Sequence, residues 1–453
     1  MTAPHEVVGA LTTRLGDRVV GSDSPEWLSR TSPWNVAVPQ APDAVVLARD
    51  VDDLRAVLEV ADTYGRQVTV QPRGHGATWG LEGTILVRPA GFDAVEVDPV
   101  ARVARIGAGV TWGRAAGALA GSALLPAYGS NPSTSVVGYL LSGGLPMFGR
   151  ALGLGVQSLR RVEILTVDGH HRWIDDDSDP ELLWALRGAG SALGVVTAVE
   201  IDLRPVTALY GGKLLFPVEA AHDVLTAVLT EGEGSDDELS LTATLIAFPP
   251  LEELPPFLAG RRVVSVDVLG LDRPDEHSAI ATRLAAVATP IVPFALAPLD
   301  VDGVHAVLQE PTDPLPARDW SRLSDADTDT VHAIADVFAS EAGAALLNVG
   351  VRVLGGALAR EGDRPAIAGP IRETHVVHGI AIAAPGDERV DLALGELRDA
   401  LDDGGPVRTV GTFLGHDQYD YSGAYDADSL HRLGLVKAAV DPAHRLVGNR
   451  DRG

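Results

Sequence analysis

A single histidine lies inside a glycine-rich turn in the first quarter of the chain. The stretch VQPRGHGATWG runs from Val70 to Gly80 and places Arg73 and His75 among glycines. Glycine lets a backbone come close to a ligand, and amide groups gathered in a turn form a concave anion site. The residues therefore predict a phosphate cradle, in which the imidazole would be a ligand or a nucleophile. The alternative is a structural histidine bonded to backbone carbonyls.

A GxGxxxG spacing occurs at several points and raises the question of a dinucleotide site. It begins at Gly74, at Gly107 and at Gly188. A Rossmann fingerprint instead needs GxGxxG between a strand and a helix, with an acidic residue about 20 positions further on. We therefore expect no Rossmann site, and each segment taken alone is typical of a turn.

Two groups of polar residues could carry chemistry but have plainer interpretations. Tyr419, Tyr421 and Tyr425 are clustered in the run GHDQYDYSGAYDADSLHRL, where they could supply a base or pack at a domain boundary. His170 and His171 precede the acidic run DDDSDPE and could be metal ligands. Adjacent strand residues point to opposite faces, so a solvated acidic turn is favoured and no metal site is expected.

The spacing of apolar residues along the sequence predicts the helices and strands that must position these residues. We expect a strand, a helix and a strand between residues 43 and 70, a helix over 111–125, and a hairpin over 160–175 with Asp168–Gly169 at its turn. A short helix at 180–190 and a strand at 193–205 follow. From residue 207 to about 404, strands alternate with alanine-rich helices, which predicts an antiparallel sheet with helices on one face. A last helix is expected over 426–440.

Composition limits the partners. The chain has 453 residues and a formal net charge of −26, which repels nucleic acid and anionic membranes. It contains no cysteine, which excludes disulfides, thiolate catalysis and cysteinyl cofactor links. We see no signal peptide and no apolar run of about 18 residues, so we expect a cytoplasmic protein.

Several motifs, in the same order, resemble a known family over essentially the whole chain. They are QPRGH, VDPVARVARIGAGVTWG, GSNPSTSVVGYLLSGGLP, ELLWALRGAGSALGVVT and RLGLVKAAVDPAHRLVGN. Together they resemble the FAD-linked oxidases of the vanillyl-alcohol oxidase type, which have a PCMH-type FAD-binding domain. Within that group the resemblance is to the berberine-bridge-enzyme-like branch.

The resemblance implies an α+β fold: a two-part PCMH-type FAD-binding domain (1–206 and 405–453) with an inserted substrate domain (207–404). It implies FAD joined through its 8α carbon to His75, and it favours Tyr425, then Tyr421 and Tyr419, as the catalytic base, with His416 and Asp417 as substitutes. The implied cofactor-binding residues are His75, Arg73, Gly74, Gly76, Ala77, Gly129, Ser130, Pro132, Val137, Gly138, Gly143, Gly144, Gly194, Val196 and Asn449.

The chain departs from the family pattern mainly near the redox end of the expected flavin. Asn131 stands where the branch with two covalent links has a cysteine, so any link is through His75 alone. Pro146 removes an amide donor from the glycine loop that begins at Ser142. The other departures are Leu152, Gln157, Ser158 and Ser191–Ala192–Leu193.

From this resemblance we expect an FAD-dependent oxidase that dehydrogenates a hydroxylated small molecule, such as a natural-product intermediate or a sugar-like alcohol, with O₂ as the electron acceptor. Two alternatives remain: a flavin-containing cyclase or isomerase without net redox, and a drug-binding resistance protein on the same scaffold. The alanine-rich, lysine-poor composition suggests a bacterial source. The oligomeric state is not indicated.

Overall fold

The computed structural model describes residues 3–190, 192–382 and 386–450. The N-terminal region begins with a sheet in the order β1-β2-β4-β3, in which β2, β4 and β3 run parallel. Apolar residues at helical spacing bury one face of α3 against this sheet, and Gly65 (φ +62°) ends the helix. These elements are α1 (Pro4–Leu15), β1 (Val19–Val20), α2 (Trp27–Thr31), β2 (Ala44–Leu47), α3 (Val51–Tyr64), β3 (Gln67–Val70) and β4 (Thr84–Arg88).

A second sheet, in the order β5-β6-β10-β8-β9, is antiparallel throughout. The predicted hairpin is confirmed, with Gly169 (φ +88°) between β8 and β9. The elements of this layer are β5 (Val95–Asp98), β6 (Val103–Gly107), α4 (Trp112–Leu119), β7 (Leu124–Leu125), α5 (Val136–Leu141), α6 (Gly149–Leu152), β8 (Leu159–Leu165), β9 (His171–Ile174), α7 (Pro180–Ala189), β10 (Val195–Asp202) and β11 (Arg204–Pro205).

The helix expected over 111–125 is shorter than predicted. α4 ends at Leu119, and residues 124–125 form β7, which pairs with β11. Gly121 (φ +73°) lies in the turn between them, in a backbone conformation that breaks a helix.

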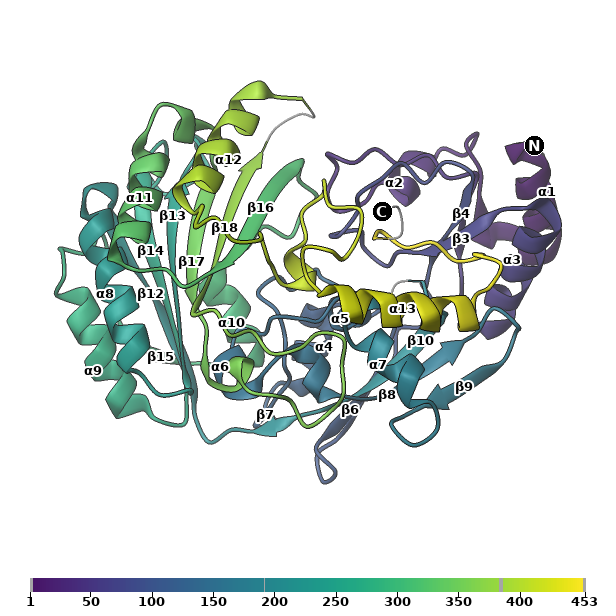
Figure 1. The fold of residues 1–453 in the computed structure, drawn as a ribbon, viewed down its shortest axis with the longest axis horizontal. Coiled ribbons are helices and arrows are strands. Elements are labelled where there is room, and N and C mark those ends of the chain that lie inside the picture. The colour runs from purple at the N-terminus through teal and green to yellow at the C-terminus, as the bar shows by residue number, and fades with distance from the viewer. Residues whose placement is uncertain (1–2, 191, 383–385, 451–453) are drawn as a thin grey trace.

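The third sheet confirms the predicted antiparallel layer, in the order β15-β12-β14-β13-β17-β18-β16. Figure 1 shows α8, α9, α11 and α12 on its outer face, turned away from α5 and α13. The elements are β12 (Leu209–Pro217), α8 (Ala221–Gly234), β13 (Leu239–Ala247), β14 (Arg262–Leu271), α9 (Pro274–Ala285), β15 (Ala297–Pro298), α10 (Val301–Leu308), β16 (Ala317–Ser324), α11 (Thr328–Ala339), β17 (Asn348–Val353), β18 (His375–Ile382) and α12 (Glu388–Ala400).

Alternation along these strands separates an apolar face from a polar one. Val264, Val266 and Val268 of β14 join the core beneath the helices. The intervening residues Ser265 and Asp267 therefore lie on the opposite face. That face is turned toward the other two sheets, so its polar side chains are available to a site between the layers.

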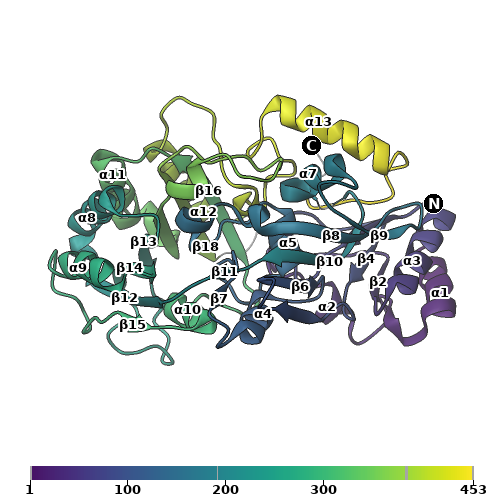
Figure 2. The same ribbon diagram turned by 90° about the horizontal axis from the view of Figure 1, so that it is seen from below.

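The C-terminal segment returns to the first sheet. Asp426 caps α13 (Ala427–Val440) by accepting a hydrogen bond from the backbone of Ser429, and the helix ends at Asp441 as predicted. Beyond it, the chain runs along β3, where the Val68 amide donates to the Arg445 carbonyl (2.7 Å). Figure 2 shows α13 lying across α7. The domain boundaries after residues 206 and 404 stay a prediction.

In the described parts of the chain, no helix is long and apolar enough to cross a membrane.

Candidate functional site

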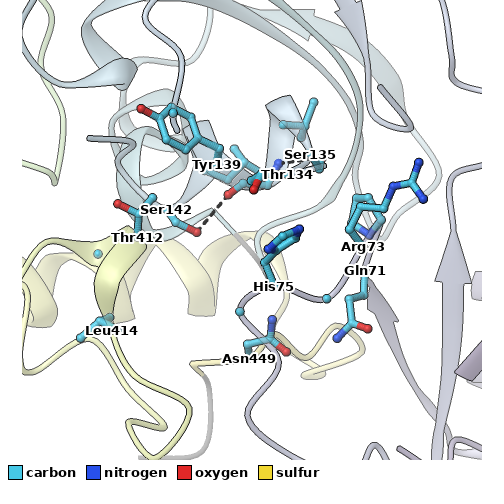
Figure 3. A pocket seen from close by; sticks show the side chains of 18 of the residues that line it. Gln71, Arg73, His75, Thr134, Ser135, Tyr139, Ser142, Thr412, Leu414 and Asn449 are labelled. Atoms are coloured by element: carbon cyan, nitrogen blue, oxygen red, sulfur yellow. Dashed lines mark hydrogen bonds between the residues drawn. The ribbon is translucent and has the colours of Figure 1, made fainter. Parts of the chain in front are cut away.

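A cavity of about 370 Å³ lies where the three sheets meet. The glycine turn of residues 70–76 forms one wall, and residues 129–142 form another. Glu310, Asp319 and Arg352 enter from the third sheet and the segment before it, and residues 411–414, 421, 449 and 450 enter from the C-terminal segment. Figure 3 shows His75 between Asn449, Arg73 and the Tyr139 side of this cavity.

The turn that carries His75 is possible only because Gly74 is a glycine. Its φ is +82°, and a Cβ there would lie 2.6 Å from Cβ of Pro33. The turn exposes Arg73 at the cavity edge and brings the amide of Gln71 to the wall. Nε2 of Gln71 is buried without a hydrogen-bond partner among the described residues, which marks a donor that awaits a ligand.

His75 is held on two sides. Its ring stacks on the indole of Trp34, with centroids 4.4 Å apart and 14° between the planes. Its Nε2 lies 3.1 Å from Oγ of Ser133. Burial lowers the pKa of His75 to about 4, a hydrogen bond to the backbone of Ser133 opposes this shift, and the charge of Arg73 adds to it. The imidazole is therefore neutral near pH 7.

The opposite wall is built by the start of α5. Oγ of Ser135 accepts a hydrogen bond from the backbone amide of Gly138 (3.2 Å), which caps the helix. Ser142 donates its hydroxyl to the Gly138 carbonyl (3.0 Å), the bond dashed in Figure 3. The Tyr139 hydroxyl is buried and has no hydrogen-bond partner within the described residues. Like Gln71, it is a polar group that a ligand would satisfy.

The third sheet supplies charge. Arg352 of β17 is only 7% exposed and donates to the Pro146 carbonyl. Burial lowers the pKa of Arg352 to about 10, whereas Tyr139 and Glu310 oppose that shift. Desolvation raises the pKa of Glu310, and hydrogen bonds from Ser130 and Asn131 act in the other direction. A cation and an acid thus face the cavity from the side opposite the glycine turn.

Of the three tyrosines predicted as the base, the structure brings only Tyr421 to the cavity. Tyr425, our first choice, donates its hydroxyl to the Gly188 carbonyl (2.7 Å), and burial raises its pKa well above 10. Tyr419 is 45% exposed and lies outside the cavity wall. The Tyr425 hydroxyl thus faces a backbone carbonyl, and the identity of the base stays a prediction. His416 bonds Asp319 (3.3 Å), and neither His416 nor Asp417 lines the wall.

Most residues predicted to bind the cofactor line the cavity. They are Arg73, Gly74, His75, Gly76, Gly129, Ser130, Val137, Gly138, Gly194, Val196 and Asn449.

The remaining four lie behind the wall. Ala77 is buried in the turn, and Pro132 packs on Gly113. A Cβ at Gly143 would face Tyr425, and one at Gly144 would meet the ring of Tyr139 at 2.5 Å. Each of these residues packs against protein, and their contact with the cofactor stays a prediction.

The residues that depart from the family pattern differ in what surrounds them: some form hydrogen bonds with the backbone, and others are buried in the core or line the cavity. Gln157 exchanges hydrogen bonds with the backbone of Arg364, so it ties the β8 side to the loop before β18. Leu193 is buried in the core, Ser158 bonds the Gly155 carbonyl, and Leu152 packs against the same core. Of the described residues that depart from the pattern, Asn131 and Ser142 line the cavity. Ser191 lies outside the described residues.

Several wall residues carry no signal in the sequence. Trp34 lies 41 positions before His75, and Arg352 sits in an ordinary apolar strand. The others that sequence reasoning missed are Gln71, Thr134, Ser135, Tyr139, Glu310, Asp319, Thr412, Leu414 and Arg450. The alternation of side chains along a strand could have placed Arg352 on the open face of β17. No local sequence pattern indicates the other wall residues.

The lining fits a flavin dinucleotide. A pyrophosphate needs amide donors and a cation, which the turn at Gly74–Gly76 and Arg73 supply. A flavin ring needs apolar walls and amide donors for its polar edge, which Val137, Val196 and Leu414 and the unpartnered Gln71 amide provide. His75 stands within the same wall.

Comparison with known proteins identifies the cofactor domain. Residues 42–175 match a family model described as an FAD binding domain. An FAD-dependent monooxygenase of Fusarium proliferatum is 32% identical over 211 residues, 45% of this chain and 41% of the relative. The (R)-6-hydroxynicotine oxidase of Paenarthrobacter nicotinovorans is 28% identical over 172 residues, 38% of each chain. These matches thus span about two fifths of the curated relatives.

The fold is shared more widely. The glucooligosaccharide oxidase of Acremonium strictum superposes with a TM-score of 0.81 and 17% identity, over 98% of this chain and 97% of that one. The first relatives are fungal, so the comparisons do not support the bacterial source that composition suggests. Residues 42–175 therefore match an FAD-binding domain, and the whole chain shares the fold of solved oxidases and of a berberine-bridge-enzyme-like protein of Physcomitrella patens.

Proposed function

We propose that this protein is an FAD-linked oxidase that dehydrogenates a hydroxylated small molecule and passes the electrons to O₂. One observation carries the proposal: a single cavity joins the His75 turn of the FAD-binding domain to charged side chains of the third sheet. Clefts between layers of this kind are the usual place for a cofactor and its substrate to meet. FAD, when bound, supplies the hydride acceptor that an oxidase needs.

Different residues of the chain would hold different parts of the cofactor. Arg73 and the amides of its turn would bind the pyrophosphate, and Gln71 would donate to a polar edge of the cofactor. His75, neutral near pH 7, would form the covalent link to the 8α carbon. A neighbouring fold, glucooligosaccharide oxidase of Acremonium strictum, is described with a 6-S-cysteinyl, 8α-N1-histidyl FAD. Asn131 replaces the cysteine here, so we propose one link only.

We propose Tyr421 as the base that takes the substrate's hydroxyl proton. It lines the cavity beside Arg450, whose pKa is lowered by burial and raised by the Tyr421 phenol and nearby acids. A tyrosine hydroxyl is one of the groups that enzymes use as a general base. The ring of Tyr425 stacks behind it (5.6 Å between centroids) and fixes its plane.

The substrate would approach over the open face of the third sheet. Arg352 and Glu310 offer a donor and an acceptor there. Behind them, Lys213 pairs with Asp267 (2.6 Å). These polar side chains suit a substrate with several hydroxyl groups better than they suit a hydrocarbon.

Anaerobic stopped-flow absorbance tests the proposal with the purified full-length protein. A panel of oligosaccharides, secondary alcohols and phenolic alcohols is mixed with the enzyme, and flavin absorbance near 450 nm is followed. We expect at least one member to bleach the flavin and, after air is admitted, to yield equimolar hydrogen peroxide. Product formation without bleaching would instead support the cyclase or isomerase. Tight binding without either would support the resistance protein.

A further inference from the structure

Asn131 links His75, through Ser133, to residues 310–311, which lie on the third sheet's side of the molecule. Its Nδ2 donates to the carbonyl of Pro311 (2.8 Å), a residue just beyond α10. Its side chain also bonds the Glu310 carboxyl group, which opposes the rise that burial causes in the pKa of that acid. A carbonyl and a carboxylate can only accept, so the amide nitrogen of Asn131 must point toward residues 310–311.

The orientation of Asn131 then sets that of Ser133. Oδ1 of Asn131 accepts from the backbone amide of Ser133 (2.8 Å) and from its hydroxyl (2.7 Å). Since the Ser133 hydroxyl has one proton and spends it on Asn131, its oxygen can only accept from the next partner. That partner is Nε2 of His75, 3.1 Å away. The hydrogen-bond directions therefore run one way, from His75 to Ser133 to Asn131 to Pro311.

A neutral imidazole carries one proton, so a proton on Nε2 leaves a lone pair on Nδ1. We propose that Asn131 and Ser133 are positioning residues for flavin attachment: they hold His75 in the Nε2–H form and so make Nδ1 the nitrogen that bonds to the flavin 8α carbon. This inference rests on the proposed function, because it assumes that FAD is linked at His75.

A second contact from the same segment supports the arrangement. The carbonyl of Thr312, next to Pro311, accepts from Nε1 of Trp34 (3.1 Å), and Trp34 stacks on His75. Trp34 is also tied to Leu315, whose amide donates to the Trp34 carbonyl (3.1 Å). Residues 311–315 thus restrain His75 through two routes, one over its ring face and one through its Nε2 edge. Residues 311–315 must therefore be in place for the imidazole of His75 to be fully oriented.

The chemistry of the step balances as follows. A bond forms between Nδ1 and the 8α carbon, which loses one proton from its methyl group, and Nε2 loses the second proton. The flavin retains the two electrons released, and dioxygen then takes them with two protons as hydrogen peroxide. The ring becomes positive as Nδ1 attacks, so the bond from Nε2–H to Ser133 strengthens at that moment and favours the reaction. The neutral state of His75 near pH 7 keeps the attacking lone pair available.

The test uses full-length protein made in a riboflavin-starved host, to which FAD is added in air. Covalent incorporation is timed by acid precipitation and intact mass, alongside FAD binding and melting temperature. We expect Ser133→Ala and Asn131→Ala to bind FAD yet incorporate it about tenfold or more slowly, as loss of a hydrogen bond to a developing charge implies. Ser133→Thr keeps the hydroxyl and should restore the rate. Ser122→Ala, whose hydroxyl bonds Leu119, is the control for a lost hydroxyl elsewhere.

The linking atom in the wild type is an independent measurement that needs no variant. The flavinyl peptide is digested and compared with synthetic Nδ1- and Nε2-linked standards, and we expect the Nδ1 isomer. A link at Nε2, or wild-type incorporation rates in both alanine variants, would overturn this inference while leaving the proposed function intact. Absence of acid-stable flavin in the wild type would instead overturn the covalent link itself.

Discussion

The hydroxyl of Tyr425 donates to the carbonyl of Gly188 at 2.7 Å. Gly188 has φ +136° and lies at the kink in α7, beside the cavity-lining Gly190. The bond ties the segment before α13 to the backbone that forms the cavity wall. Tyr425 thus has a structural task, and its neighbour Tyr421 alone among the C-terminal tyrosines faces the cavity.

The two stacked tyrosines should respond differently to loss of the hydroxyl. We expect Tyr421→Phe to retain flavin and melting temperature but to reduce flavin on the order of a hundredfold more slowly, as for a lost general base. Tyr425→Phe should reduce flavin at the wild-type rate but unfold with about 1–2 kcal/mol less free energy, because the Gly188 carbonyl loses its donor. Stopped-flow kinetics and denaturant titrations measure both. The reverse pattern would return the base to Tyr425.

Removal of the imidazole at residue 75 should free the flavin. We expect the wild type to stay yellow after acid denaturation and to give one flavinylated peptide, which contains His75. His75→Ala should bind FAD but release it into the acid supernatant. Mass spectrometry of the digest decides the matter: flavin on any other peptide would show that the alignment of the glycine turn is wrong.

A buried arginine should contribute strongly to stability. Arg187 is 0% exposed, and its guanidinium bonds the Leu159 carbonyl (2.8 and 3.1 Å) and Asp176 (2.6 and 2.9 Å). Arg187→Met would strip these acceptors of their donor, and we expect about 3 kcal/mol less free energy of unfolding.

The matched control is Arg372→Met, since Arg372 pairs with Glu361 across 3.4 Å at the surface. We expect it to change the unfolding free energy by less than about 0.5 kcal/mol. Equal effects of the two variants in urea titrations would contradict the importance assigned to the buried network.

Mild acid should destabilise the fold through two histidines of β18. Burial lowers the pKa of His375 to about 4, with Arg150 assisting and Asp325 opposing. Burial and Arg352 lower the pKa of His378 to about 4, against Asp319. Between pH 6.5 and 4 the unfolded chain binds protons on these residues and the folded one does not, so the free energy of unfolding falls as the pH falls through that window.

Each histidine would contribute on the order of 3 kcal/mol across the full window. Urea titrations from pH 7 to 4 measure the slope, and His378→Asn should reduce it, since one of the titrating histidines is gone. An unchanged slope in that variant would mean that His378 is already protonated in the folded state.

Local sequence patterns determined many of the helices, strands and turns of this protein. Runs of strand-forming apolar residues made β12, β13 and β14 of the third sheet predictable, and helical spacing ending in Gly65 made α3 predictable, because both depend on neighbours a few residues apart. The turn around His75 was predictable for the same reason: only glycine tolerates the backbone at Gly74. The order of these segments was enough to indicate an FAD-binding fold.

What surrounds His75 was decided by contacts between distant parts of the chain. Trp34 and Ser133 contact the same imidazole, and Asn131 connects Ser133 to Pro311, although hundreds of positions separate Trp34 from Pro311. No periodicity encodes such a meeting, because it depends on how whole layers pack. The same holds for Tyr425: its place before α13 was readable, but the direction of its hydroxyl follows from the kink at Gly188, which the packing of α7 against α13 brings within reach. Side-chain direction at a site is therefore a property of the packed layers, whereas the elements that carry it are properties of the local chain.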